Sequence, residues 1–151
     1  FDVNDGPQAD PRAATTHPAT LELLADAGLV DDMIRVGLVA PIVQFWDRPS
    51  GAKMAEFDHA LLARDTRFPF VVQCEQFKTA QLIHDRLEHF GNVETLWGHE
   101  VVDVEQSADD VTFSVRGPGG LTRHTGAFAI GAAGGRSAVR KARGLAFDGF
   151  T

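Results

Sequence analysis

A glycine-rich turn followed by basic side chains is the part of the sequence whose residue types could do chemistry, because it can hold an anion. Residues 126–144 read GAFAIGAAGGRSAVRKARG. This pattern predicts an apolar strand at Ala127–Ile130, a glycine turn, and a basic helix that begins at Arg136–Ser137. The backbone N–H groups of such a turn point to one spot, and the helix dipole adds partial positive charge there.

The spacing of two arginines is compatible with this anion site. Arg136 and Arg140 are four residues apart and therefore share a helix face. Two cations near a helix N-terminus oppose its dipole, and an anionic ligand would relieve that opposition. The alternative is an ordinary strand–turn–helix corner with solvated arginines. The residue types alone leave both interpretations open, since glycine-rich loops are common.

The sequence of this segment resembles a motif of class A FAD-dependent (aromatic-ring) monooxygenases, which have the p-hydroxybenzoate hydroxylase-like fold. That motif is written G-A-D-G-x-x-S-x-V-R-x-x-x-G, and its aspartate is Ala133 in this sequence. In the family the loop contacts FAD and the incoming nicotinamide cofactor. The resemblance therefore implies cofactor contacts from four matching residues: Gly131, Gly134, Ser137 and Arg140.

Two further blocks carry the same resemblance. PRAATTHPATLELLADAGLVDDM is similar to a family segment whose arginine reaches the adenosine and pyrophosphate side of FAD, and the matching residue is Arg12. A solvated loop arginine is the alternative for Arg12. FPFVVQCEQFKTAQLIHDRL is similar to a family helix preceded by a glutamine that hydrogen-bonds FAD, which implies the same contact from Gln73.

The elements that must position these residues are predicted from local patterns. A helix is expected to begin near Thr15–Thr16, with Pro18 close to its first position, and to end at Gly28. A second helix is expected at 30–36, followed by a β-hairpin within residues 38–62.

Three aromatic residues of the predicted hairpin have two possible roles. Phe45, Trp46 and Phe57 lie on either side of a Pro-Ser-Gly turn at 49–51. The family resemblance implies that this region begins the sheet over the reacting face of the flavin, where these rings would line a substrate pocket. Packing in the core is the alternative, and their residue types favour it.

The second half of the chain is predicted to contain a strand, a long helix and a β meander. Residues 68–72 form the strand, and an amphipathic helix follows to Gly91 with Phe77, Ile83 and Leu87 on one stripe. Alternating apolar residues then predict strands in four ranges: 93–97, 100–106, 111–116 and 121–130.

Composition limits the classes of function. The 151 residues are 44% hydrophobic and carry a net charge of −7 with a pI near 5.2, which argues against nucleic acid and anionic membranes as partners. No apolar run has the length of a membrane span. A single cysteine, Cys74, fits a reducing cytoplasm and is expected to be buried and inert. Six scattered histidines give no metal site.

Together these observations predict a mixed α/β (α+β) fold that resembles the central part of such a flavoprotein. Residues 1–37 and 73–151 would belong to the FAD-binding part and residues 38–72 to the start of the substrate sheet, within one incomplete domain. No G-x-G-x-x-G turn of an N-terminal Rossmann unit occurs. We therefore expect an internal fragment of the enzyme, inactive on its own and prone to form a homo-oligomer.

The resemblance implies a parent enzyme that uses FAD and NAD(P)H to transfer one oxygen of O₂ to a small aromatic substrate. The flavin would carry that chemistry, so no side chain of this chain is expected to be a covalent catalyst. Two alternatives remain at this point. The chain could be a module that binds a nucleotide or another anion, or a self-associating structural fragment without activity.

Overall fold

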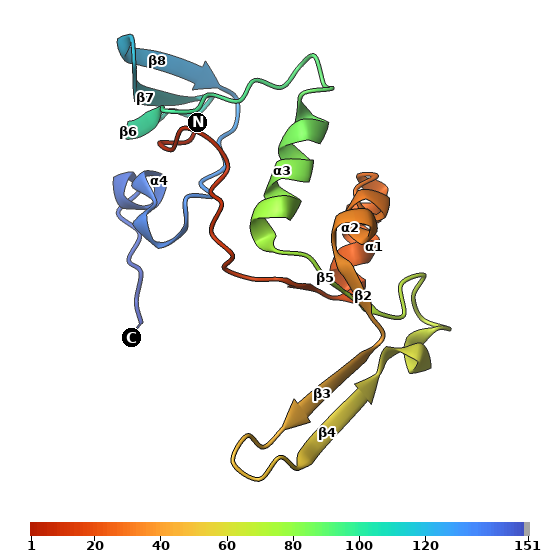
Figure 1. Cartoon of the computed structure of the whole chain (residues 1–151). Coiled ribbons are helices and arrows are strands. Elements are labelled where there is room, and N and C mark those ends of the chain that lie inside the picture. The colour runs from red at the N-terminus through yellow and green to blue at the C-terminus, as the bar shows by residue number, and fades with distance from the viewer. Residues whose placement is uncertain (150–151) are drawn as a thin grey trace. The chain divides into compact units, whose positions relative to one another are not determined.

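A computed structural model describes residues 1–149 and divides the chain into two compact units. The helical unit comprises Pro7–Val93, and the meander unit joins Phe1–Gly6 to the residues from Glu94 onward. Both units are drawn in Figure 1. Helices and antiparallel strands are both present, so the predicted mixed class is confirmed.

A three-stranded antiparallel sheet lies at the centre of the helical unit. Its middle strand is β5 (Val71–Gln73), which pairs with β1 (Thr15–Thr16) on one side and with β2 (Leu38–Ala40) on the other. Thr15–Thr16 is therefore a strand, and the predicted helix begins after it with Pro18 at its first position, as expected. The backbone groups of these two residues bond to β5 instead of to a following helical turn.

Three helices pack around this sheet. They are α1 (Pro18–Asp26), α2 (Val30–Val36) and α3 (Gln76–Leu87). Pro18 occupies the start of α1, where its missing N–H costs nothing, and Gly28 takes the positive φ of 71° that ends the turn after it. The bounds of α2 agree with the prediction, whereas α3 ends before Gly91.

The core of the helical unit is a small apolar cluster between these helices and β5. Its fully or almost fully buried members are Leu21, Val30, Met33, Val72 and Cys74. The prediction that the thiol of Cys74 is buried is confirmed, and the hydroxyl of Thr79 lies 3.6 Å from its sulfur. The stripe of α3 is only partly buried: Leu82 packs against the cluster, while Ile83 and Leu87 keep about a third of their surface exposed.

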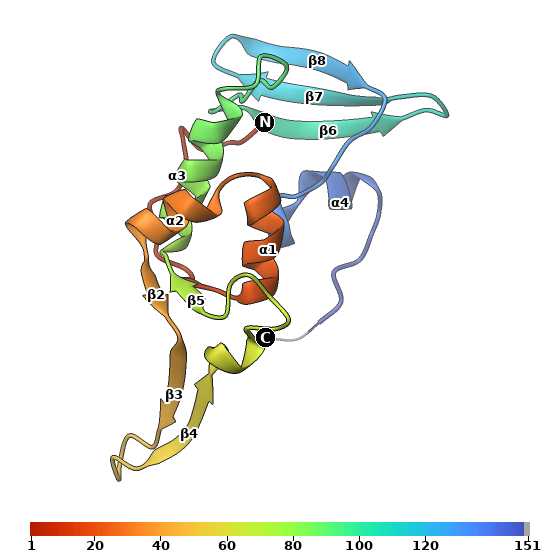
Figure 2. The same cartoon turned by 90° about the vertical axis from the view of Figure 1, so that its right-hand side faces the viewer.

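The predicted hairpin is present and extends away from the sheet. Strands β3 (Ile42–Trp46) and β4 (Lys53–Asp58) pair antiparallel, with Val43 opposite Phe57. Figures 1 and 2 both show this two-stranded ribbon projecting from the rest of the helical unit. A 3₁₀ helix at His59–Leu62 follows β4, and the side chain of Asp58 caps it by accepting a 2.8 Å bond from the N–H of Ala60.

The three hairpin aromatics are exposed, so the core-packing interpretation is wrong. Phe45, Trp46 and Phe57 retain 56%, 55% and 57% of their surface. A two-stranded ribbon has no second layer against its faces, and for this reason its rings stay accessible even though their residue type usually lies inside.

The meander unit is a three-stranded antiparallel sheet with the strand order β6-β7-β8 (Figure 2). Its strands are β6 (Glu100–Gln106), β7 (Val111–Gly117) and β8 (Gly120–Gly126). Val104 and Val115 are the buried residues of these strands, as the valine alternation indicated. The short helix α4 (Ala138–Ala142) packs near β6 and is preceded by a 3₁₀ turn at Gly134–Arg136.

Two predicted strands are not formed. Residues 93–97 are irregular: the carbonyl of Leu96 bonds to Asp2 and the N–H of Gly98 to Asn4, and Gly98 has a positive φ of 65° that interrupts an extended chain. The segment 127–130 is also irregular, and Phe128 and Ile130 are 93% and 90% exposed. In the described part of the chain no strand pairs with it, and a strand without a partner has no ladder to stabilise it.

A charged contact ties the loop before β5 to α1. Both carboxylate oxygens of Glu22 accept bonds from residues 66 and 67, including 2.8 and 2.6 Å bonds from Nε and a terminal nitrogen of Arg67. These bonds, above all those from the Arg67 side chain, lower the pKa of Glu22 from 4.5 to about 2.

Among the described residues no helix has the length and apolar character that crossing a membrane requires.

The Glu22 contact predicts a specific pH dependence. A lowered pKa means that the ionised carboxylate stabilises the fold above pH 4.5 and that this stabilisation is lost as the pH falls toward 2. Glu22→Gln should therefore lower the urea midpoint at pH 7, and its difference from the wild type should shrink on acidification. The exposed Glu94→Gln serves as control. A Glu22→Gln deficit that is the same at pH 7 and pH 3 would contradict the prediction.

Two leucines on α1 test where the core lies. Leu21 is fully buried and Leu23 is 73% exposed, so the same substitution can be compared on one helix. Leu21→Ala should reduce the free energy of unfolding by about 2–5 kcal/mol because it leaves a cavity. Leu23→Ala should change it by less than about 0.5 kcal/mol. Urea unfolding followed by circular dichroism measures the free energy of unfolding of both variants. Equal decreases in the two would contradict the burial of Leu21 in the core.

Candidate cofactor and substrate sites

Two of the predicted cofactor residues, Arg12 and Gln73, lie on adjacent segments of the helical unit. Residues 13–16 run along β5: the carbonyls of Ala13 and Ala14 accept 2.7 Å bonds from the N–H groups of Gln76 and Cys74. In the strand register, Thr15 stands opposite Gln73. Arg12 directly precedes this paired segment, whereas Gln73 lies on the middle strand of the sheet.

The side chains of these two residues are held differently. The carbonyl oxygen of the Gln73 amide accepts a 2.9 Å bond from the hydroxyl of Thr15, which leaves its NH₂ group as the donor for a ligand. Arg12 is exposed, and its Nε donates a 3.1 Å bond to Asp10. An exposed ion pair of this kind is weak, so an anionic ligand can replace Asp10 at little cost.

The four other predicted cofactor residues belong to the meander unit: Gly131 and Gly134 lie on the loop before α4, Ser137 is the N-cap of α4, and Arg140 lies within it. Gly131 approaches this helix so closely that a Cβ added to it would lie 2.9 Å from the Cβ of Val139. Gly134 has a positive φ of 63°, which side-chain-bearing residues rarely adopt. Both glycines are therefore required by the shape of the loop itself.

Ser137 and Arg140 also act within this loop. Ser137 is only 4% exposed, and its hydroxyl accepts a bond from the N–H of Arg140 at 3.2 Å as the N-cap of α4. The guanidinium of Arg140 donates to the carbonyls of Leu145 and Gly135 at 2.8 and 3.1 Å and lies 5.1 Å from the ring centre of Phe147. Arg140 thus holds the loop closed. Helix α4 has only five residues, so the partial positive charge at its N-terminus is smaller than that of the longer helix indicated by the sequence pattern.

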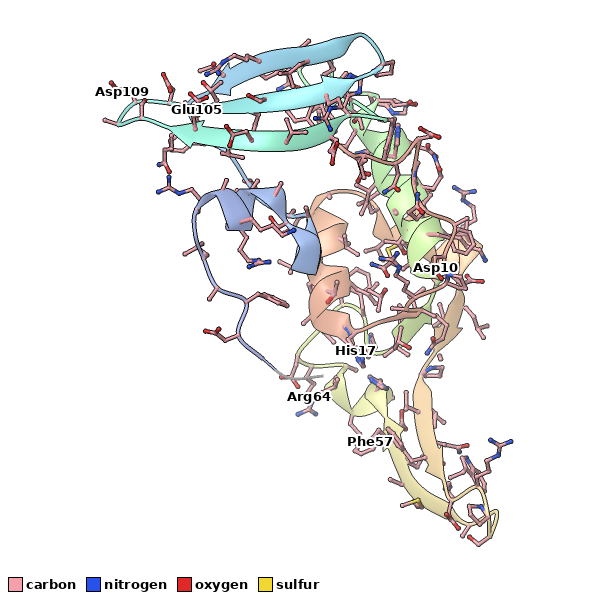
Figure 3. All side chains as sticks on the ribbon, turned by 90° about the vertical axis from the view of Figure 1, so that its left-hand side faces the viewer. Asp10, His17, Phe57, Arg64, Glu105 and Asp109 are labelled. Carbon is pink, nitrogen blue, oxygen red and sulfur yellow. The ribbon has the colours of Figure 1, made fainter. Side chains whose placement is uncertain are left out.

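A hollow of about 490 Å³ opens on one face of the hairpin. Its walls include the rings of Phe45 and Phe57, the side chains of Leu61 and Leu62 from the 3₁₀ helix, and the imidazoles of His17 and His59. The two phenyl rings meet edge to face, with centres 5.9 Å apart and an interplanar angle of 86°. Figure 3 labels His17 at the base of α1 and Phe57 on β4, both next to the 3₁₀ helix.

Sequence reasoning considered Phe45 and Phe57 as pocket residues but missed the two histidines and the two leucines. The sequence contains a signal for a helical turn here: Asp58 is a good helix-capping residue, and His59, Ala60 and the two leucines follow it. That pattern indicates a helical turn after β4, and such a turn would fold the leucines back over the hairpin. His17 is brought to the hollow by β1 and α1, which local patterns do not reveal.

Other groups of polar side chains are less organised. A second hollow of about 440 Å³ lies between the segment 7–9 and α3, where Lys78 is paired with Glu75 at 2.7 Å. On α3, ligand atoms of His84, Asp85 and Glu88 lie within 4.8 Å of one another, but both carboxylates are exposed. Exposed acidic side chains commonly gather in this way without a metal ion.

Comparison with known proteins identifies the fold that carries these residues. A family model described as an FAD binding domain matches residues 2–151. The chain belongs to this family. Its relatives include the para-nitrophenol 4-monooxygenase of Pseudomonas sp. (strain WBC-3), with 31% identity over all of this chain and 37% of the relative. The 6-methylpretetramide 4-monooxygenase of Streptomyces rimosus is 33% identical over 99% of this chain and 26% of its own length.

Solved structures agree with this placement. The crystal structure of p-nitrophenol 4-monooxygenase PnpA from Pseudomonas putida DLL-E4 matches with a TM-score of 0.93 and 32% identity, over 99% of this chain and 38% of that one. OxyS anhydrotetracycline hydroxylase from Streptomyces rimosus matches with a TM-score of 0.83 and 30% identity, over 100% and 29%. The resemblance to FAD-dependent aromatic monooxygenases is thereby confirmed. The chain spans between about a quarter and two fifths of the length of these relatives.

The close approach of Gly131 to Val139 predicts the cost of one methyl group. Gly131→Ala should lower the free energy of unfolding by about 1–3 kcal/mol, because neither the loop nor α4 can move apart without losing contacts. Gly119→Ala is the matched control, since a Cβ there meets no atom within 4 Å and its φ is not positive. Thermal unfolding measures both variants. Equal midpoints for the two would contradict the packing described for this loop.

Proposed function

We propose that this chain forms part of an FAD-dependent monooxygenase that hydroxylates an aromatic substrate, with NAD(P)H as reductant. The observation that carries the proposal is the match of the FAD binding domain family over residues 2–151. The para-nitrophenol 4-monooxygenase and the 6-methylpretetramide 4-monooxygenase among the relatives support the reaction class. The chain would supply part of the cofactor site and one wall of the substrate site.

The donors near β5 suit the cofactor. FAD presents pyrophosphate oxygens, which are anionic, and flavin oxygens, which accept hydrogen bonds. Arg12 offers an accessible guanidinium for the former, and Gln73 offers an NH₂ group for the latter without the cost of burying a charge. The bond from Thr15 holds the Gln73 amide in place before the cofactor arrives, which reduces the entropy lost on binding.

The loop at 131–140 would contribute mainly through its backbone. Gly131, Gly134 and Ser137 give this loop a defined shape, and Arg140 fixes it by bonding the carbonyl of Gly135 within it and that of Leu145 beyond it. A loop held in this way keeps its N–H groups oriented for FAD or for the incoming nicotinamide cofactor. In this proposal Arg140 is a positioning residue, and Ala133 offers no carboxylate to the cofactor.

Oxygen activation and transfer are chemistry that the flavin supplies when it is bound. The protein has to hold the aromatic ring and keep water away from it. The hollow against the hairpin fits this task, because its phenyl rings and leucine side chains offer apolar surface and its volume lies in the usual range for small ligands.

FAD titration tests the cofactor part of the proposal. Gln73→Ala removes a hydrogen bond worth about 0.5–1.5 kcal/mol and should weaken binding about two- to tenfold. Arg12→Ala removes a charged partner and should weaken it more. Gln106→Ala, an exposed amide in the meander unit, is the control. Quenching of flavin fluorescence gives the dissociation constants, and equal values for all variants would overturn the assignment.

The same titration has an expected limit for this chain of 151 residues. Nanomolar binding needs about 12 kcal/mol, whereas one restored carboxylate in Ala133→Asp adds about 1.5–3 kcal/mol. We therefore expect FAD to be lost on desalting, with or without Ala133→Asp. A flavin absorption band at one FAD per chain after desalting would show that the 151 residues form a complete site.

A further inference from the structure

We infer that Thr15 is a positioning residue for the cofactor, because its hydroxyl sets which end of the Gln73 amide faces the ligand. The inference rests on the proposed function, since it assigns the residue that makes Gln73 a hydrogen-bond donor toward FAD. Three observations carry it: the fixed backbones of the two residues, their shared face of the sheet, and the bond between their side chains.

The first observation is that the backbones on both sides of this bond are fixed. The carbonyls of Ala13 and Ala14 accept 2.7 Å bonds from the N–H groups of Gln76 and Cys74, on either side of the pair. Strand β2 pairs with the other edge of β5. Neither backbone can therefore shift without breaking ladder bonds, and the freedom that remains belongs to the rotatable bonds of the Gln73 side chain.

The second observation concerns the neighbours of Gln73. Residues directly opposite each other in antiparallel strands place their side chains on the same face of the sheet. Gln73 lies opposite Thr15 on β1 and opposite Leu38 on β2. A leucine side chain has no hydrogen-bonding group, so of these two neighbours only Thr15 can orient the amide. Leu38 is 67% exposed and Thr15 is also exposed, so a ligand can reach Gln73 between them.

The third observation is the direction of the bond. Oγ1 of Thr15 donates to Oε1 of Gln73 at 2.9 Å, which engages the amide oxygen and leaves both N–H donors of the NH₂ group. Turning the amide over would exchange the two ends and present its oxygen to the ligand. The phosphate and carbonyl oxygens of FAD are acceptors, so that orientation would place acceptor against acceptor. The hydroxyl therefore selects the orientation that suits the cofactor.

FAD titration of Thr15 variants tests the assignment. Thr15→Val keeps the branched shape but removes the hydroxyl, and it should weaken FAD binding about two- to tenfold, as expected for one hydrogen bond. Thr15→Ser keeps the hydroxyl and should bind FAD as the wild type does. Thr16→Val is the matched control, because successive strand residues point to opposite faces of the sheet. Quenching of flavin fluorescence gives the dissociation constants.

A double substitution separates positioning from a general effect on the fold. In a chain that already carries Gln73→Ala, Thr15→Val should not weaken FAD binding further, because the amide through which the hydroxyl acts is absent. A hydroxyl that only stabilised β1, or that touched FAD directly, would cost the same affinity with and without the Gln73 amide.

Gln73→Glu tests which end of the amide faces the ligand. The carboxylate can still accept the bond from Thr15, but an oxygen then replaces the NH₂ group. This variant should bind FAD more weakly than Gln73→Ala does, even in about 0.5 M salt, which screens charges more than about 4–5 Å apart. Binding as tight as in the wild type would show that the amide oxygen faces the cofactor and would overturn the inference.

A measurement without cofactor tests the same bond. NMR relaxation of the Gln73 side-chain NH₂ group should show an ordered amide in the wild type and in Thr15→Ser, and a mobile one in Thr15→Val. The exposed amide of Gln106 is the mobile reference. A wild-type Gln73 amide as mobile as that of Gln106 would overturn the inference.

The outcomes distinguish the inference from the function on which it rests. Equal FAD affinity of Thr15→Val and the wild type, or a Thr15→Val effect that persists in the Gln73→Ala chain, overturns the positioning role while the cofactor site stands. Absence of FAD binding to the wild type overturns the proposed cofactor site, and the inference with it, whatever the relaxation of the amide shows.

Discussion

The pairing of β5 on both of its edges is the constraint on which the helical unit depends. Val71 and Val72 have no exposed surface, and Cys74, which follows Gln73, is also buried. A slip of one residue in this strand would move Val72 out of the core and Gln73 into it, at the cost of an unsatisfied amide. The same register that fills the core therefore places Gln73 beside Thr15, whose hydroxyl bonds the Gln73 amide.

Local patterns in the sequence were sufficient for most of the elements. The bounds of α2, the hairpin and the meander follow from spacing, turn residues and alternation, all of which act within a few residues. The failures have one cause. Residues 127–130 and 93–97 have apolar sequences typical of strands, but a strand exists only where another backbone accepts its bonds, and sequence spacing does not show that partner.

Burial and the site were harder to predict for a related reason. Phe45 and Phe57 have the composition of core residues, yet the number of layers that cover a ribbon is a property of the whole fold. The family resemblance supplied Arg12 and Gln73 as individual residues. Gln73 is held by a bond from Thr15, 58 positions away in the sequence, which no local pattern indicates. His59 was missed because its contact with the carbonyl of Pro41 depends on the pairing of the two hairpin strands.

The loop at 131–140 shows how a changed motif residue can leave a shape intact. Ala133 stands directly before the 3₁₀ turn at Gly134–Arg136, in the position where a carboxylate would cap the turn, and no side-chain cap is present. The loop is nevertheless held by the contact of Gly131 with Val139, by the buried hydroxyl of Ser137, and by the bonds of Arg140 to Gly135 and Leu145. These contacts do not involve residue 133. The exchange of the motif aspartate for alanine therefore removes a negative charge and a cap from the loop surface, while the backbone that would face the cofactor keeps its own supports.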